Sequence, residues 1–69
     1  MKYWICSDAE GISLLCGETA PVLEDGVFYA DDDGFWIEQE YLDVLGIKYP
    51  KFLAEGSCLP LKLKIRSSW

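Results

Sequence analysis

The sequence predicts a small α+β domain, mainly antiparallel β, with about five strands in a meander or curled sheet and one short helix near residues 38–45. Short apolar, β-prone runs recur along the chain, separated by turns rich in Gly, Asp and Pro, and one stretch changes to helical spacing. The 69 residues form a single domain, residues 1–69. With 51% hydrophobic residues and ten aromatics, the composition excludes an intrinsically disordered chain.

The first two strands are predicted at residues 2–8 and 12–17, joined by a turn that closes on Gly11. If Asp8 pairs with Ile12, the two strands present two apolar faces. One face carries Trp4, Cys6, Ile12, Leu14 and Cys16, and the other carries Tyr3, Ile5 and Leu15. Two apolar faces indicate a strand pair that is covered on both sides or lies at an interface.

Pro21 ends this pattern, and residues 24–26 are typical of a turn. Residues 27–30 and 35–37 flank the acidic run 31–34, which predicts a second hairpin. From Glu38 the apolar residues fall at helical spacing, acids crowd the first turn, and Gly46 is placed to end the helix. These signals predict a short helix over residues 38–45.

Residues 51–54, between Pro50 and Gly56, are predicted as an edge strand. The clearest alternation comes last, where Leu59, Leu61, Leu63 and Ile65 alternate with Pro60, Lys62, Lys64 and Arg66. This pattern predicts a half-buried antiparallel strand, and pairing of that strand with the first would close a curled sheet.

Charge is segregated along the chain. Residues 3–47 contain eleven carboxylates and no Lys or Arg, whereas the other residues carry all six basic groups and one acid, Glu55. The net charge of −6 is therefore the sum of −11 and +5. This segregation is compatible with a cationic partner, a DNA-like acidic face, or a counterweight to the basic last strand, and the sequence does not choose among them.

The residue types argue against an enzyme. The sequence has no histidine, which excludes Ser–His and Cys–His arrangements. Cys6 and Cys16 lie in apolar runs, where thiols are usually inert, and Cys58 is expected to be the most exposed thiol. Three cysteines without a C-x-x-C pair indicate reduced thiols and no disulfide framework.

The acidic run 31–34 partly matches the pattern of a calcium-binding loop. Aligning Gly34 with the loop glycine places Asp31, Asp33 and Glu40 at ligand positions, but the first ligand position is Tyr29. A solvated turn is the preferred interpretation, and no metal or cofactor is expected. Zinc is disfavoured because the chain offers three scattered cysteines and no histidine.

Direct nucleic-acid binding is not expected, because the row Lys62, Lys64 and Arg66 is a weak footprint on a molecule of net charge −6. No stretch approaches the ~20 apolar residues of a membrane span, and the first eight residues do not resemble a signal peptide. A cytoplasmic location is therefore expected.

Several short elements carry a resemblance. The opening strand Lys2-Tyr3-Trp4-Ile5 is followed by Asp8, Gly11, the Leu14-Leu15 strand and Pro21, and later by Phe35-Trp36-Ile37, Tyr49-Pro50 and the alternating run 59–65. This layout resembles small uncharacterised accessory proteins encoded by bacteriophages and prophages. The Asp-rich middle and the basic last strand depart from it. The resemblance implies an accessory gene working in a bacterial cytoplasm, and it assigns no functional residues.

These observations lead to the expectation of a non-enzymatic phage or prophage accessory protein that acts by protein–protein binding. Two alternatives stay open: an acidic DNA mimic or inhibitor of a host nucleic-acid-binding or defence protein, and a self-associating structural component. A protein partner or a homo-oligomer is expected because ten aromatics exceed what a small core needs. The expected interaction surface comprises Asp31, Asp32, Asp33 and Trp36.

Overall fold

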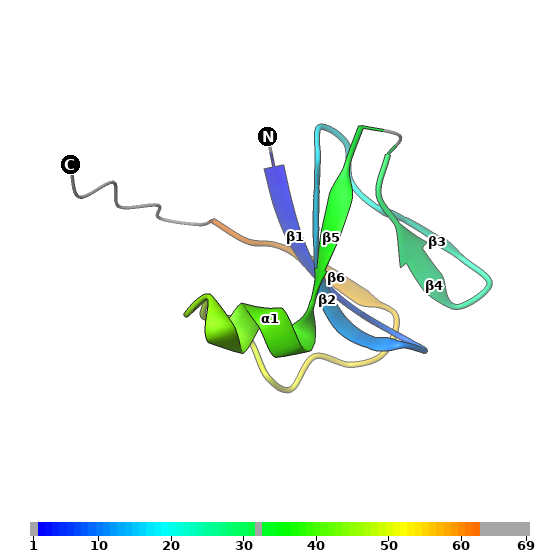
Figure 1. Ribbon diagram of the computed structural model, residues 1–69. Coiled ribbons are helices and arrows are strands. Elements are labelled where there is room, and N and C mark those ends of the chain that lie inside the picture. Colours follow the sequence, from blue (N-terminus) through cyan, green and yellow to red (C-terminus); the bar gives the residue numbers. More distant parts are fainter. Residues whose placement is uncertain (1, 32, 63–69) are drawn as a thin grey trace.

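The computed structural model describes residues 2–31 and 33–62 and confirms the predicted class, an α+β fold dominated by antiparallel strands with one short helix (Figure 1). The elements in chain order are β1 (Lys2–Asp8), β2 (Gly11–Gly17), β3 (Val22–Glu24), β4 (Val27–Tyr29), β5 (Phe35–Glu38), α1 (Gln39–Val44) and β6 (Ser57–Pro60). The strands described form a four-stranded sheet in the order β5-β2-β1-β6 and a separate two-stranded sheet, β3-β4. The order differs from a simple meander because β6 returns to pair with β1.

The first hairpin forms as predicted, but its predicted register is wrong by one residue. Asp8 pairs with Gly11 rather than with Ile12, so the loop has only two residues. The Asp8 carboxylate accepts a hydrogen bond from the Glu10 N–H at 2.9 Å, and Gly11 takes a φ of 113°, which together close the turn early. A one-residue shift moves every partner to the other face. Ile5 therefore lies opposite Leu14.

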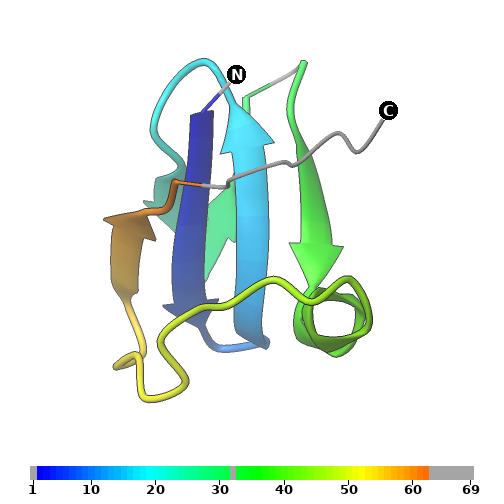
Figure 2. The same cartoon turned by 90° about the vertical axis from the view of Figure 1, so that its left-hand side faces the viewer.

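Both faces of the β1–β2 pair are covered, as the apolar pattern predicted. On one face, Ile5, Leu14 and Cys16 form the main core with Leu42 and Tyr49. On the other face, Cys6 and Leu15 are 0% and 2% exposed. Figure 2 shows α1 and the loop that follows it in front of the large sheet, with the β3–β4 hairpin behind it.

The prediction that residues 27–30 and 35–37 pair as a hairpin is wrong, because these two segments are not partners. Strand β4 pairs instead with β3 through a two-residue turn, and β5 pairs with β2. The turn residues Asp25 and Gly26 have φ values of 51° and 80°, the left-handed pair that matches the twist of a tight hairpin. This turn gives β4 a partner only three residues away, so the acidic run 31–34 connects the two sheets rather than closing a hairpin.

The predicted helix is confirmed as α1, which is six residues long. It ends in a Schellman motif, since the Gly46 N–H donates to the Asp43 carbonyl at 3.2 Å and the Ile47 N–H donates to the Leu42 carbonyl at 3.0 Å. Gly46 supplies the left-handed φ of 73° that this motif requires. Leu42 is 0% exposed and attaches the helix to the core, which a helix this short needs.

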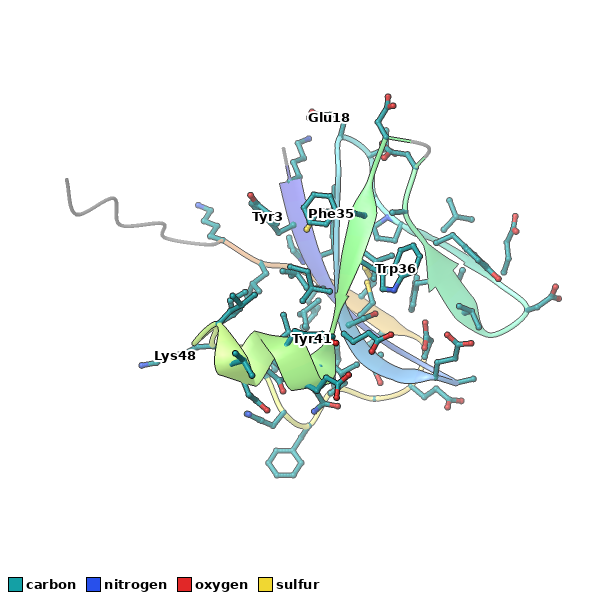
Figure 3. The ribbon with its side chains drawn as sticks, in the orientation of Figure 1. Tyr3, Glu18, Phe35, Trp36, Tyr41 and Lys48 are labelled. Atoms are coloured by element: carbon teal, nitrogen blue, oxygen red, sulfur yellow. The ribbon has the colours of Figure 1, made fainter. Side chains whose placement is uncertain are left out.

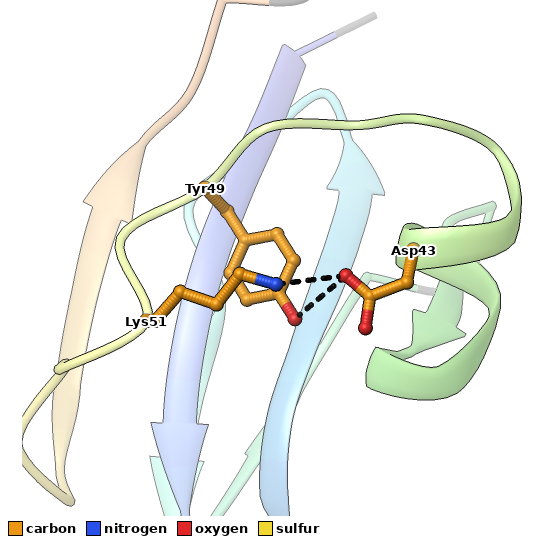
Figure 4. Close-up of polar contacts among 3 residues, drawn as sticks. All are labelled: Asp43, Tyr49 and Lys51. Atoms are coloured by element: carbon orange, nitrogen blue, oxygen red, sulfur yellow. Dashed lines mark hydrogen bonds and ion pairs between the residues drawn. The ribbon is translucent and has the colours of Figure 1, made fainter.

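The predicted edge strand at residues 51–54 is wrong, because this segment is irregular. Leu53 of this segment packs against the core, as Tyr49 just before it does, whereas Phe52 is fully exposed. Tyr49 and Lys51 also fasten the segment to α1 through one oxygen of Asp43 (Figure 4). The Lys51 Nζ lies 2.9 Å from that oxygen and 4.6 Å from the centre of the Tyr49 ring.

The predicted pairing of the last strand with the first is confirmed by β6, which pairs antiparallel with β1. The strand begins at Ser57, two residues earlier than expected, and in the described part of the chain it ends at Pro60. Leu61 packs against the core. Leu63, Lys64, Ile65 and Arg66 lie outside the described residues.

Candidate binding groove

A groove of about 580 Å³ opens between the β3–β4 hairpin and the β2–β5 side of the large sheet. Leu15, Phe28 and Trp36 contribute its apolar walls. Five carboxylates line the same space: Asp8, Glu10, Asp31, Glu38 and Glu40. We call this space the acidic groove.

Trp36 is the largest side chain of the acidic groove. It lies opposite Leu15 in the β2–β5 pair, on the face turned toward β4 (Figure 3). Trp36 is 64% exposed, so much of its indole ring is accessible from solvent. Because side chains alternate along a strand, neighbouring Phe35 points to the opposite face of the sheet.

Asp8 belongs to the groove lining but has a structural role. It is only 7% exposed, and its two oxygens accept hydrogen bonds from the Glu10 and Phe28 backbone N–H groups, each at 2.9 Å. The Ala9 N–H adds a bond to the Gly26 carbonyl at 3.0 Å. These bonds tie the β1–β2 turn to the β3–β4 hairpin and so fix the width of the groove at that end.

Asp31 is also anchored. Its Oδ2 accepts hydrogen bonds from the Glu18 N–H and the Thr19 hydroxyl, each at 3.2 Å. Its Oδ1 is buried and has no hydrogen-bond partner among the described residues. The carboxylate thus points inward, beside Gly17 and Gly34, rather than into a solvated turn.

The structure unites only part of the interaction surface predicted from the sequence. Asp31 and Trp36 both line the acidic groove, whereas Asp33 is exposed in the adjoining turn and is not part of the lining. Asp32 lies outside the described residues. The acidic run therefore does not present a single face in the described structure, because Asp31 turns toward residues 18–19.

Three exposed carboxylates complete the groove: Glu10 from the β1–β2 turn, Glu38 from the end of β5 and Glu40 from the first turn of α1. None of them has an ion-pair partner among the described residues. Sequence reasoning missed this group because only the β2–β5 pairing, with Ser13 opposite Glu38, brings the turn and the helix start to one edge. The sequence alone relates Glu38 and Glu40 to the first turn of the helix, and Glu40 to the calcium-loop pattern, but not to Glu10.

No described lysine lines the acidic groove, so an aromatic wall faces a local excess of negative charge. Such a space suits a cation that carries apolar or planar groups. Within the described residues, no three His, Cys, Asp or Glu side chains gather in an arrangement that would hold a metal ion.

A second exposed apolar area adjoins the groove. Trp36, Ile37, Tyr41, Val44 and Leu45 form a shallow surface over β5 and α1, which we call the β5–α1 surface. Val44 is 81% exposed and Leu45 is 61% exposed. Strand β5 is an edge strand of the large sheet, so its outer backbone groups have no strand partner within the described chain.

Comparison with protein-family models, with curated proteins and with solved structures finds no match to this chain. Of the helices described, none has the length and apolar character that crossing a membrane requires.

Proposed function

We propose that this protein is a non-enzymatic binding protein that acts by protein–protein contact, and that its acidic groove takes a Lys or Arg side chain of the partner. One observation carries the proposal: the exposed Trp36 lies among Glu10, Glu38 and Glu40, none of which is ion-paired in the described structure.

A cation in this groove gains two interactions at once. An ammonium or guanidinium group over an indole face contributes about 0.5–2 kcal/mol, depending on how well water is excluded. The surrounding carboxylates add Coulomb attraction and accelerate encounter with a positively charged surface. The chain itself contains this combination, since Lys51 lies over the Tyr49 ring while bonding to Asp43.

The partner's chemistry follows from the groove's charge. Phosphate groups are repelled by the carboxylates, so we propose a basic protein surface rather than nucleic acid. A host nucleic-acid-binding or defence protein offers such a surface. The proposal includes that the protein is a phage or prophage accessory protein, as its sequence resemblance implies, and that it acts in the bacterial cytoplasm.

The test titrates a fluorescently labelled tetra-arginine peptide with the full-length protein and follows its anisotropy at about 25 mM and about 150 mM salt. Between these salt concentrations the Debye length, over which charges are screened, falls from roughly 20 Å to about 8 Å. The double variant Glu38→Gln/Glu40→Gln should weaken binding by about tenfold, since each lost charge removes on the order of 0.5–1 kcal/mol. The shapes of these side chains are retained, so the fold should be unaffected.

The matched control is Glu24→Gln/Glu55→Gln, which removes the same charge from exposed positions outside the groove lining. This control should change the affinity by less than about twofold, reflecting only long-range screening. Equal losses in the two double variants would show that net charge, not the groove, attracts the peptide. Absence of binding at low salt would refute the cation site.

A second candidate function, self-association, is favoured by the β5–α1 surface. An unpaired edge strand beside exposed Tyr41, Val44 and Leu45 is a template for pairing with a second copy. Sedimentation of the purified protein tests it: Val44→Glu should abolish any dimer, whereas a monomer at high micromolar concentration rules this candidate out.

A further inference from the structure

Two thiols that lie 52 positions apart in the sequence face each other across the β1–β6 pair. Cys6 and Cys58 are direct partners in the register, and their sulfur atoms are 2.8 Å apart. This separation is about 0.8 Å longer than the ~2.0 Å of a disulfide bond. Both thiols are free in the structure.

The backbone at this position has the geometry that a disulfide requires. Residues facing each other in an antiparallel pair alternate between hydrogen-bonded and non-hydrogen-bonded positions. The Leu61 N–H donates to the Tyr3 carbonyl at 2.9 Å, which places the next pair, Trp4 with Pro60, at a non-hydrogen-bonded position. Pro60, which has no N–H, loses nothing there.

Cys6 and Cys58 lie two residues further along the strands and therefore occupy the same kind of position. Non-hydrogen-bonded partners bring their Cα atoms to about 4.5 Å, the closest approach in a sheet. That value falls inside the range of about 4.4–6.8 Å observed for disulfides. Closing the bond therefore needs a small side-chain rotation and no change of register.

We propose that Cys6 and Cys58 are a disulfide-forming pair, oxidised in the folded protein by a low-molecular-weight disulfide such as oxidised glutathione. The Cys58 thiolate attacks one glutathione sulfur, forms a mixed disulfide and releases one glutathione thiolate. The Cys6 thiolate then attacks the Cys58 sulfur, forms the Cys6–Cys58 bond and releases the second glutathione. Two protein thiols lose two protons and two electrons, and one oxidised glutathione becomes two reduced ones.

The environment of the two thiols sets this order. Cys58 is half-buried on an edge strand, whereas Cys6 is completely buried. Burial raises the pKa of both thiols, but the hydrogen bond from Cys6 works against this at Cys58 and stabilises its thiolate. Cys58 is therefore the thiol that ionises first and meets an oxidant from solvent.

The bond would covalently link β6, an edge strand, to the central strand β1 (Figure 2). Because the described part of β6 has only four residues, this attachment would convert one of the shortest pairings in the sheet into a covalent one. The segment 47–56, which covers the core, would then be held at both ends.

The test incubates the native full-length protein with oxidised glutathione at pH 8 and measures intact mass and peptide maps after alkylation. We expect a loss of about 2 Da, alkylation of Cys16 alone, and a linked pair of peptides containing Cys6 and Cys58. The midpoint of thermal unfolding should rise by on the order of 10 °C and return to its original value with reductant.

Two variants serve as controls. Cys58→Ser should abolish the bond, and Cys16→Ser should leave it intact because Cys16 is a buried thiol on β2 with no facing cysteine. If Cys16→Ser fails to fold, the wild-type peptide map alone decides which thiols are joined. A persistent glutathione adduct on Cys58, a bond involving Cys16, or oxidation only in denaturant would each overturn the proposal.

Discussion

Asp8 shows how much of this fold depends on single polar side chains. The carboxylate is almost fully buried, and it accepts backbone hydrogen bonds from its own turn and from β4. The sequence marked Asp8 only as the start of a turn, because the chain pattern does not show that the second hairpin folds back over it. Asp31 is a second example. Its place in an acidic run predicted a solvated carboxylate, yet that carboxylate accepts hydrogen bonds from the Glu18 N–H and the Thr19 hydroxyl.

Replacing Asp8 with Ala should destabilise the protein by on the order of 2 kcal/mol, because the Phe28 N–H would lose its acceptor in a partly buried site. Urea denaturation measures the change in the free energy of unfolding. Asp33→Ala, at an exposed turn position, should change that free energy by less than ~0.5 kcal/mol. Equal effects of the two substitutions would contradict the role given to Asp8.

Trp36 is the opposite case, a large side chain that stability hardly needs. Since Trp36 is 64% exposed, Trp36→Ala should leave the urea midpoint nearly unchanged while weakening tetra-arginine binding at least about twofold, the factor that corresponds to about 0.5 kcal/mol. Trp36→Phe keeps an aromatic face and should recover part of that binding. A Trp36→Ala variant that binds normally would remove the aromatic wall from the proposed site. Trp36 is one of the two residues of the predicted interaction surface, with Asp31, that line the acidic groove.

At the scale of elements, the sequence predicted strands and the helix better than their partners. The strands of the first hairpin and α1 were predicted from local periodicity, although the register of that hairpin was wrong by one residue, and the β1–β6 pairing was also predicted correctly. The partner of β4 was not predicted, because the three-residue β3 lies behind Pro21 and shows no alternation. The acidic groove was not predicted for the same reason, because it exists only where the β3–β4 hairpin lies over the β2–β5 pair.

Alanine substitutions at two glycines should be destabilising for different reasons, a left-handed backbone at Gly46 and a steric overlap at Gly34. Gly46→Ala should cost about 1 kcal/mol, because the site has a φ of 73° and no atom within 4 Å of a new Cβ. Gly34→Ala should cost more, since its Cβ would overlap the Cys16 carbonyl oxygen on β2. Urea denaturation ranks the two, and the reverse order would contradict this placement of residue 34. Gly46→Asn, which tolerates a left-handed backbone, should be milder than Gly46→Ala.

For the whole molecule, the buried thiols set the pH dependence at the alkaline end. Burial raises the pKa of Cys6, Cys16 and Cys58 above the ordinary value of 9.0. Above that pH the unfolded chain loses thiol protons that the native protein keeps, so the free energy of unfolding falls as pH rises. Each thiol contributes a slope of up to about 1.4 kcal/mol per pH unit.

Urea denaturation under reductant between pH 8 and 10 measures this decline. Cys16→Ser should make the slope shallower by about one thiol's share, because serine does not ionise in this range. A slope that stays unchanged in this variant would show that Cys16 is not kept protonated by folding. Below pH 8 the three thiols should contribute no pH dependence, since both states hold their protons.

The separation of charge along the sequence predicts only part of how the charges are arranged in the folded protein. The excess of carboxylates could be read directly, but its concentration beside Trp36 could not, because the residues come from a turn, a strand end and a helix start. Long-range pairing decides which exposed acids become neighbours, and no local pattern encodes it.

Pro60 has a consequence for how copies of this domain could associate. At a non-hydrogen-bonded position its backbone nitrogen faces away from β1, so the outer rim of β6 lacks a donor where a further strand would dock. The opposite rim, along β5, has no such gap in its described residues. A sheet that is extendable at one rim and blocked at the other stops growing after two molecules join rim to rim, which favours a closed twofold pair over an endless fibre.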